Sequence, residues 1–317
     1  MPEICVGIDV GGTFTKVAAV APSGRVLLEA QLPAEVAAGP ASFVDRISAL
    51  IGAWRSQRGL KISGVGLGLA GDVDSERGAL RFAPNLRGWN GFEFKKAFEK
   101  RLKTRVAVDN DANVAVWGAF RTELKGRPRN VVGVTLGTGV GGGLIVERKL
   151  YRGSTGSAGE IGHTIVEPGG EKCHCGRRGC LEAYAGAYGI LRSARKLLDE
   201  SPGKGEVLRA RVPDLARLTP AQLTEAADDG DEIARAVWAR TARYLAVGMA
   251  NLVLVMNPEV VLILGGVSRA GRWILDPIEE HFAAQPFKTA FGRARVKLAD
   301  NQNAGRVGAA LLALEDF

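Results

Sequence analysis

Short runs of apolar residues, broken by glycine and by charged residues, recur along the whole chain. The first run, residues 4–9, is typical of a buried strand, and Gly11-Gly12-Thr13 predicts a tight turn into a second strand over residues 15–20. A third strand is expected over residues 25–32, after a further turn. The chain is therefore predicted to open with three strands joined by hairpins.

Helical spacing follows the opening strands. Apolar residues lie on one face of a helix over residues 42–57, namely Phe43, Ile47, Leu50, Ile51 and Trp54. Strands are expected over residues 65–69 and 106–108, and the second leads into a helix that ends near residue 124. Later helices are predicted over residues 184–198, 213–227, 231–256 and 305–314, with strands over residues 259–264 and 296–298.

The stretch from Val132 to Gly139 repeats the pattern of the stretch from Val6 to Thr13. Each is an apolar strand followed by a hairpin of glycine and threonine, and another strand follows, over residues 142–146 in the second copy. A repeat of this kind indicates two similar lobes that face each other across a cleft. We expect a small lobe over residues 1–115, joined by a terminal helix at 305–317, and a large lobe over residues 116–304.

The composition is ordinary for a globular protein with a sizeable core. The chain has 317 residues, of which 46% are hydrophobic and 24% are charged, and this length favours two lobes over one. The apolar runs are too short and too often interrupted to span a membrane. The N-terminus leads straight into the first strand without a signal peptide. We therefore expect a cytoplasmic protein with no membrane partner.

The formal net charge of +8 suits either nucleic acid or anionic substrates. Lysine and arginine are spread along the chain, and two denser stretches, at residues 95–105 and 121–129, are typical of solvated helix faces. No zinc finger or RNA-binding signature is present. We therefore interpret the basic residues as solvated surface, and no nucleic-acid partner is expected.

Three of the four cysteines are close together in the sequence. Cys173, Cys175 and Cys180 form a C-x-C-x4-C pattern, and His163 precedes them. Three thiolates and one imidazole suit a tetrahedral zinc ion. The fourth cysteine, Cys5, lies in an apolar run and is expected to be a core residue. The sequence therefore predicts a zinc site, and a reducing compartment fits both the metal-bound thiolates and a free core cysteine.

The first hairpin has the residues of a phosphate-binding turn. Gly11 and Gly12 let backbone N–H groups approach a phosphate closely. Thr13 and Lys16 add donors, and Asp9 is suited to hold a hydrated Mg²⁺ ion. Alone, this pattern also fits an ordinary glycine-rich hairpin, and neither hairpin has the spacing of a Walker loop. The second copy favours nucleotide binding, with matching residues Thr135, Gly137, Thr138 and Gly139.

A carboxylate follows the strand at residues 106–108. Asp111 lies where this strand ends and the next helix starts, so one interpretation is a helix N-cap. The other is a general base, because a carboxylate at the carboxyl end of a strand in a cleft accepts a proton from an attacking hydroxyl. Asn110 beside it can bind another hydroxyl, and Asp109 is expected to point elsewhere. We favour the general-base interpretation.

The segment around the cysteines resembles a known family. Glu-Ile-Gly-His at residues 160–163, followed by Cys-x-Cys-Gly-x-x-Gly-Cys-Leu-Glu at residues 173–182, is similar to the signature of the ROK family of sugar kinases and sugar-responsive repressors. The resemblance implies an α/β, two-lobed actin-like ATPase (ribonuclease H-like) fold with a cleft between the lobes. It also implies a structural zinc at the cysteine cluster and sugar contacts from Glu160, His163 and Glu182.

The same resemblance extends to three other segments. Asn85, in Ala83-Pro84-Asn85-Leu86, matches a loop whose asparagine contacts sugar hydroxyls, and Asn110-Asp111 matches the catalytic dipeptide, with Asp111 at the attacking hydroxyl. Gly265 and Gly266 match the loop that packs against adenosine. Ala70-Gly71 departs from the usual Pro-Gly, which affects a turn and no expected ligand.

The activity implied is the ATP-dependent phosphorylation of a hexose at its 6-hydroxyl, with Mg²⁺, by a homodimer. Residues 181–185, Leu-Glu-Ala-Tyr-Ala, resemble the glucokinases of the family and favour glucose. N-acetylmannosamine, N-acetylglucosamine, fructose and allose kinases share the same sugar-binding residues and stay open. The donor could also be polyphosphate or ADP.

Two other classes are disfavoured. A sugar-responsive repressor carries an additional helix-turn-helix before the first hairpin, and here that hairpin already begins at Asp9. An ATPase of the actin or chaperone type has no need of a His/Cys₃ cluster flanked by carboxylates. An enzyme that phosphorylates a hexose is therefore the expectation.

Overall fold

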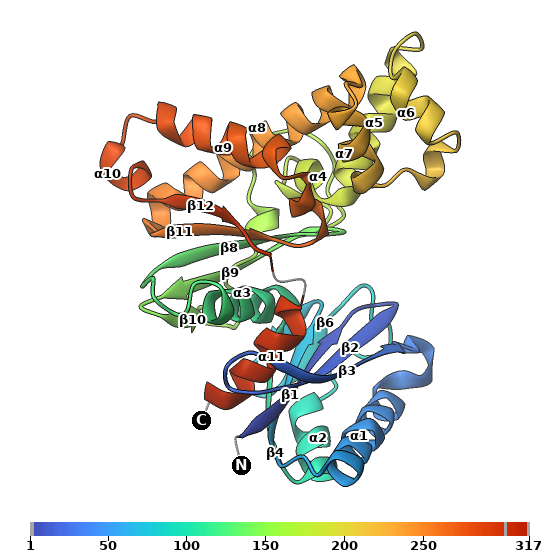
Figure 1. The fold of residues 1–317 in the computed structure, drawn as a ribbon, viewed down its shortest axis with the longest axis vertical. Helices are drawn as coiled ribbons and strands as arrows, with labels where there is room; N and C mark the ends of the chain where they lie inside the picture. The colour runs from blue at the N-terminus through green and yellow to red at the C-terminus, as the bar shows by residue number, and fades with distance from the viewer. Residues whose placement is uncertain (1–2, 301–302, 316–317) are drawn as a thin grey trace. The chain divides into compact units, whose positions relative to one another are not determined.

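The computed structural model describes residues 3–300 and 303–315. They form two compact units, each built of strands and helices (Figure 1), which confirms the α/β prediction. Unit 1 comprises Met1–Arg127, Gly143–Gly159 and Asn301–Phe317, and unit 2 comprises Pro128–Gly142 and Glu160–Asp300. Within the described ranges, no helix is both long enough and apolar enough to cross a membrane.

Unit 1 contains a five-stranded mixed sheet. Its strands, in spatial order, are β3 (Val26–Pro33), β2 (Phe14–Val20), β1 (Ile4–Val10), β4 (Ile62–Leu69) and β7 (Arg105–Asn110). The opening strands β1, β2 and β3 are antiparallel, as the hairpin pattern predicts, whereas β1, β4 and β7 run parallel. The carboxyl ends of these three parallel strands therefore meet at one edge of the sheet.

Helices cover the sheet of unit 1. Helices α1 (Gly39–Arg58) and α2 (Phe94–Leu102) pack on each other, and α3 (Asp111–Thr122) packs on α11 (Ala304–Glu315), which also contacts β1 and β4 (Figure 1). The core beneath α1 and α2 is aromatic, because Phe43 lies between Phe94 and Trp89 at ring-centre distances of 6.2 and 5.0 Å. The predicted terminal helix therefore packs within the first unit; its last two predicted residues, 316 and 317, lie outside the described ranges.

The second five-stranded sheet has the order β10 (Lys149–Tyr151), β9 (Val140–Val146), β8 (Val131–Leu136), β11 (Val260–Leu264) and β12 (Arg295–Leu298). Strands β8, β11 and β12 are parallel. The division between the two units falls inside β9. A two-stranded sheet of β5 (Asp72–Asp74) and β6 (Ala79–Phe82) belongs to unit 1.

Unit 2 carries most of the helices. These are α4 (Glu182–Ala185), α5 (Ala187–Glu200), α6 (Glu206–Arg211), α7 (Pro220–Asp228), α8 (Glu232–Met256), α9 (Arg272–Ala284) and α10 (Lys288–Phe291). Short 3₁₀ turns complete the described elements: η1 (Val36–Ala38), η2 (Ile161–His163), η3 (Leu215–Arg217) and η4 (Gly266–Ala270). The long predicted helix over residues 231–256 is confirmed as α8.

Two predicted helices differ from those observed. The helix expected over residues 184–198 is broken at Gly186, where the backbone is extended, so α4 and α5 are separate. The helix expected from residue 213 begins only at Pro220, because Thr219 and Gln222 form a capping box there. Helix α9 was not predicted.

The units divide the chain differently from the predicted lobes at 1–115 and 116–304. A division after residue 115 would cut α3, which lies whole in unit 1. The segment Gly143–Gly159 also belongs to unit 1, since Arg152 pairs with Asp109 and the hydroxyl of Ser157 donates to Asp72 at 2.8 Å. These contacts are remote in sequence, so the local pattern did not reveal them.

Candidate active site and metal centre

One edge of the unit 1 sheet gathers several predicted site residues. In the parallel register, Asp9 of β1 is opposite Gly68 of β4, and Gly68 is opposite Asp109 of β7. Asn110 ends β7 and Asp111 begins α3 at the same edge. The carboxyl ends of parallel strands are the usual place for ligands in α/β sheets, so unit 1 presents a candidate site there.

The carboxylate of Asp9 is held in a constrained position. A Cβ added to Gly305, in the first turn of α11, would lie 2.7 Å from its Oδ2 atom. Burial raises the pKa of Asp9 above its ordinary value, while the positive charges of Lys16 and Arg306 act to lower it. Lys16 is opposite Asp9 in the β1–β2 pairing. The first hairpin thus brings together an acidic and a basic group.

Asn85 lies against the same hairpin. A Cβ added to Gly12 would be 3.2 Å from the Cβ of Asn85. The loop that carries Asn85 is fixed by Trp89, which is fully buried and donates from Nε1 to the carbonyl of Val36 at 3.0 Å. The structure therefore brings the predicted sugar ligand Asn85 next to the predicted phosphate-binding turn.

The N-cap of α3 is Asn110 and not Asp111. The side-chain oxygen of Asn110 accepts from the backbone N–H groups of Ala112 at 2.8 Å and Asn113 at 3.2 Å, and its amide donates to the carbonyl of Gly71 at 3.0 Å. The alternative interpretation of Asp111 as the cap is therefore wrong. Asp111 occupies the first helical position.

Asp109 has a structural role that the sequence analysis missed. Its carboxylate is 1% exposed, and Oδ1 accepts from the amide of Asn113 and from the backbone N–H of Asn110, both at 2.8 Å. Its Oδ2 accepts from Nε of Arg152 at 2.6 Å. The ion pair joins the end of β7, the first turn of α3 and the segment after β10. Asp109 therefore belongs to a hydrogen-bond network with a remote arginine.

The predicted metal ligands converge in unit 2. The ligand atoms of His163, Cys173, Cys175 and Cys180 all lie within 4.8 Å of one another. Nδ1 of His163 is 3.8 Å from Sγ of Cys173, and the sulfurs of Cys175 and Cys180 are 3.7 Å apart. A zinc–thiolate tetrahedron has an edge of about 3.8 Å. The donor set and its spacing therefore fit a tetrahedral zinc ion.

Two of the three clustered thiols have raised pKa values. Burial raises the pKa of Cys180 to about 12 and also raises the pKa of Cys173. Without a cation these thiols keep their protons, and a bound cation would replace them. The loop is shaped for this by Gly176 and Gly179, both with positive φ angles of 90° and 80°.

The two predicted carboxylates flank this cluster in different ways. Nε2 of His163, the nitrogen that faces away from Cys173, is 3.9 Å from Oε2 of Glu160. Glu182 begins α4, and its Oε2 accepts from the backbone N–H of Val140 at 3.1 Å. Both carboxylates are therefore close to the metal ligands, as the sequence spacing predicts.

The second hairpin packs against α4 and α5. The N–H of Ala187 donates to the carbonyl of Gly137 at 2.9 Å, and a Cβ on Gly186 would be 3.1 Å from the carbonyl of Thr138. A Cβ on Gly139 would collide with the carboxylate of Glu182. Glycine is required here because the carboxylate of Glu182 and the hairpin backbone approach so closely.

The predicted adenosine loop lies beside that hairpin. Thr135 of β8 is opposite Leu264 of β11, so the loops that follow these parallel strands are neighbours. Gly265 has a φ angle of 101°, and a Cβ there would collide with the carbonyl of Leu136, whereas the space next to Gly266 is open. Open backbone at this position is what close packing of a nucleoside needs.

The predicted residues thus form two sets, one in each unit. Unit 1 holds Asp9, Gly11, Gly12, Thr13, Lys16, Asn85, Asn110 and Asp111. Unit 2 holds Thr135, Gly137, Thr138, Gly139, Glu160, His163, Cys173, Cys175, Cys180, Glu182, Gly265 and Gly266.

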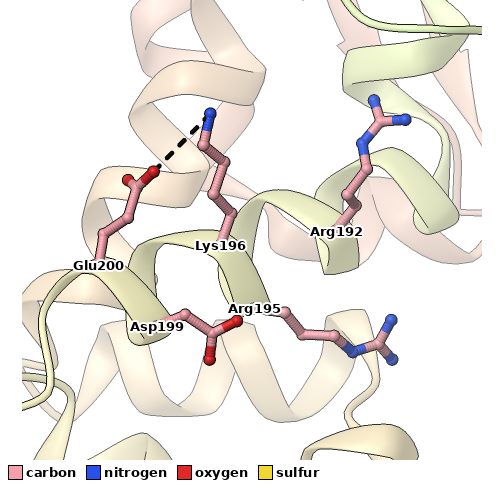
Figure 2. Close-up of a pocket in the computed structure, with 5 residues that line it drawn as sticks. All are labelled: Arg192, Arg195, Lys196, Asp199 and Glu200. Atoms are coloured by element: carbon pink, nitrogen blue, oxygen red, sulfur yellow. Dashed lines mark ion pairs between the residues drawn. The ribbon is translucent and has the colours of Figure 1, made fainter.

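A separate hollow lies on the surface of α5 (Figure 2). It is lined by Arg192, Arg195, Lys196, Asp199 and Glu200. Lys196 pairs with Glu200 at 3.8 Å, and Arg195 donates to the carbonyl of Leu215 at 3.1 Å. None of the predicted site residues lines this hollow.

A comparison with models of protein families tests the family membership that the motifs indicate. The model described as "ROK family" matches residues 5–316. The chain belongs to the ROK family. Among curated relatives, the glucokinase of Halalkalibacterium halodurans is 37% identical over 310 residues, covering 96% of this chain and 92% of the relative. The glucokinase of Thermotoga maritima is 33% identical over 317 residues, covering 99% of each.

A solved ROK structure has the same fold. The ROK family glucokinase from Streptomyces griseus, crystallised in complex with glucose and AMPPNP, is 34% identical, with a TM-score of 0.83. The alignment covers 99% of this chain and 100% of that chain. The predicted actin-like ATPase fold of the ROK kinases is therefore confirmed.

Proposed function

We propose that the protein catalyses the ATP-dependent phosphorylation of glucose at its 6-hydroxyl. The observation that carries the proposal is the similarity to glucokinases along nearly the whole of both chains. Two features of the structure support it. In unit 2, Glu160 and Glu182 lie close to the cluster of His163 and the cysteines. In unit 1, Asn85 lies against the first hairpin and Asp111 lies at the carboxyl edge of the sheet.

Five side chains are proposed to bind the hydroxyls of the hexose: Asn85, Asn110, Glu160, His163 and Glu182. The carboxylates accept hydrogen bonds from hydroxyls, and the amides both donate and accept. The amide nitrogen of Asn110 uses one hydrogen for Gly71 and has a second for the sugar. Nδ1 of His163, which is 3.8 Å from Sγ of Cys173, would hold the metal, and Nε2 would then be left as a fixed donor.

Asp111 is proposed as the general base. Its carboxylate accepts the proton of the 6-hydroxyl as that oxygen bonds to the γ-phosphorus. The bond from the γ-phosphorus to the bridging oxygen breaks, and ADP leaves with that electron pair. The products are glucose 6-phosphate, ADP and a proton. His163 is unsuited to this role, because in a metal cluster the nitrogen that would accept the proton is occupied.

The nucleotide is proposed to bind through three glycine-rich segments. These are Asp9, Gly11, Gly12, Thr13 and Lys16 in the first hairpin, Thr135, Gly137, Thr138 and Gly139 in the second, and Gly265 with Gly266 at the adenosine. Backbone N–H groups and Lys16 balance the phosphate charge. Mg²⁺ bound with ATP would neutralise charge on the transferred phosphoryl group, and Asp9 has the oxygen ligands that this ion prefers.

Zinc is proposed as the ion of the cysteine cluster. It would stabilise the fold of this segment and would take no part in the reaction. Cys173, Cys175, Cys180 and His163 would hold it. The thiolates that this site needs fit a cytoplasmic, reducing environment. A homodimer is proposed from family membership, and light scattering that gives twice the mass of one chain would support it, whereas the mass of one chain would contradict it.

The experiment that tests the function is a coupled ADP-release assay with Mg-ATP and a panel of sugars. The panel holds glucose, mannose, fructose, allose, N-acetylglucosamine and N-acetylmannosamine, each over a range of concentrations. We expect the largest kcat/KM for glucose. A larger value for an acetylated amino sugar would replace glucose in the proposal, and a sugar that binds without any turnover would contradict a kinase. Polyphosphate and ADP in place of ATP test the donor.

A further inference from the structure

Tyr188 connects the metal cluster to Glu182. This tyrosine lies in the first turn of α5, and its hydroxyl donates toward Sγ of Cys173 at 3.6 Å and toward Oε1 of Glu182 at 3.4 Å. The sulfur of Cys173 and Oε1 of Glu182 are themselves 3.5 Å apart. The three atoms therefore form a triangle in which each is within reach of the other two.

Two side chains pack on the ring of Tyr188. It stacks on the imidazole of His174, with ring centres 3.9 Å apart and an interplanar angle of 18°. Arg192, one turn further along α5 (Figure 2), places its guanidinium carbon 5.9 Å from the ring centre and donates to the carbonyl of Ala183 at 2.8 Å. The hydroxyl is thus fixed between the two acceptors by packing at the ring.

The triangle needs this donor once the cluster holds a metal. Cys173 is then a thiolate and has no proton to give to Glu182. A metal-bound sulfur and a carboxylate oxygen at 3.5 Å are both acceptors, and two negative atoms at that distance repel. The phenol of Tyr188 is the donor within the triangle, and its proton is shared between a metal ligand and a carboxylate proposed to bind sugar.

We propose that Tyr188 is a positioning residue that couples the metal cluster to Glu182, so that metal retention and sugar affinity depend on the same hydroxyl. The inference rests on the proposed function, in which Glu182 accepts a hydrogen bond from a sugar hydroxyl. Hydrogen bonds to metal ligands from the surrounding residues tune metal affinity, and an oriented carboxylate binds a hydroxyl with less loss of conformational freedom.

The test compares Tyr188→Phe with wild type, both loaded with zinc. Phenylalanine keeps the ring and its stacking on His174 and removes only the hydroxyl. Tyr244→Phe is the matched control. The hydroxyl of Tyr244 donates to Glu167 at 3.2 Å, and its ring stacks on Tyr184, which packs beside Cys173 and Cys180. Two quantities are measured on each protein: the rate of zinc loss to excess chelator, and the glucose dissociation constant by calorimetry.

For Tyr188→Phe we expect zinc loss about tenfold faster and glucose binding about fivefold weaker. Tyr244→Phe is expected to match wild type in both. A change in zinc loss alone, a change in glucose affinity alone, or no change in either would overturn the coupling. The same changes in Tyr244→Phe would overturn it as well, because they would show a general effect of removing a tyrosine hydroxyl from this region.

Failure of the proposed function is recognisable separately. Neither readout depends on turnover, so a wild type that binds glucose but does not phosphorylate it contradicts the kinase proposal and leaves the coupling measurable. A wild type that does not bind glucose overturns both, because Glu182 would then not be a glucose ligand.

Discussion

Nε of Arg152 donates to Oδ2 of Asp109 across 2.6 Å, and the carboxylate that accepts this hydrogen bond is 1% exposed. Asp109 directly precedes Asn110 and Asp111 in the chain. The hydrogen bond from Arg152 fixes the end of β7, where Asn110 and Asp111 follow. The position of the proposed general base therefore depends on an arginine that is 43 residues away from Asp109 in sequence.

Removal of the arginine is expected to destabilise the protein. Arg152→Met leaves the Asp109 carboxylate buried without its cation, and this should lower the free energy of unfolding by about 3 kcal/mol. The double variant Arg152→Met/Asp109→Asn removes the charge as well and should recover part of the loss. Urea denaturation measures both. As a control, Arg101→Met breaks an exposed ion pair with Asp45 and should change the free energy of unfolding by less than about 1 kcal/mol. If Arg152→Met/Asp109→Asn were less stable than Arg152→Met, this account would be contradicted.

Substitution of the proposed base separates chemistry from binding. Asp111→Asn keeps the size and helix position of the side chain but removes its ability to accept a proton. We expect kcat for glucose phosphorylation to fall by a factor of about 10² to 10⁴, with the glucose dissociation constant within about threefold of wild type. Asp45→Asn, at an exposed position, should leave both unchanged. A kcat for Asp111→Asn close to wild type would rule out the base assignment.

The close approach of α11 to Asp9 predicts the effect of a single methyl group. In Gly305→Ala, the new Cβ would be 2.7 Å from Oδ2 of Asp9, so the carboxylate or the start of α11 must shift. We expect a higher KM for Mg-ATP, with the KM for glucose little changed. Gly52→Ala, in a helix where no atom lies within 4 Å of the added Cβ, serves as control and should be neutral or slightly stabilising. An unchanged KM for Mg-ATP in Gly305→Ala would argue against Asp9 as a nucleotide residue.

The raised pKa of Asp9 predicts opposite effects on stability and on nucleotide binding. Because the folded-state pKa exceeds the unfolded one, the stability that this group contributes is present at low pH and is lost as pH rises through the folded pKa. At neutral pH, Asp9→Asn should therefore raise the melting temperature of the ligand-free protein, while it weakens Mg-ATP binding. In wild type, the KM for Mg-ATP should rise as pH falls toward that pKa, because the carboxylate becomes protonated. Differential scanning fluorimetry that shows a lower melting temperature for Asp9→Asn would contradict the linkage.

The cysteine cluster predicts one zinc ion per chain in purified protein, measured by elemental analysis. Cys175→Ser removes one of the four donors and should lose most of the zinc and a large part of the glucose affinity, since Glu160 and Glu182 border the same loop. Cys5→Ala is the control: Cys5 is buried in unit 1 beside Ser63 and should keep the metal. Metal-free wild type with full activity would refute the proposed role of zinc.

Local pattern was enough to predict most strands and the longest helix, because periodicity of apolar residues directly reflects a buried face. It failed where tertiary contacts override that pattern. Gly186 interrupts an otherwise helical run because it packs on the backbone of Thr138 and Gly139. Helix α9 contains Pro277, which disfavours a helix locally, but its Ile274, Ile278 and Phe282 are buried and packing on α8 compensates.

In the candidate site, too, some contacts were predictable from the local sequence and others were not. The metal ligands follow one another within a short segment, so their spacing in sequence already predicts their convergence, and the two hairpins were visible as a repeat. The pairing of Asp109 with Arg152 and the contact of Tyr188 with Cys173 and Glu182 had no local signal. Asn110 as the helix cap was also missed, because Asn and Asp are equally good caps and adjacent in the sequence.

The central claim is glucose phosphorylation, and the most direct measurement is the stoichiometry of one reaction. Purified protein is mixed with glucose and Mg-ATP, and the products are followed by ³¹P NMR and by enzymatic assay of ADP. The account predicts one glucose 6-phosphate and one ADP for each glucose consumed, with no ADP formed when glucose is omitted. ADP release that does not depend on glucose, or glucose that remains unphosphorylated in the presence of Mg-ATP, would contradict it.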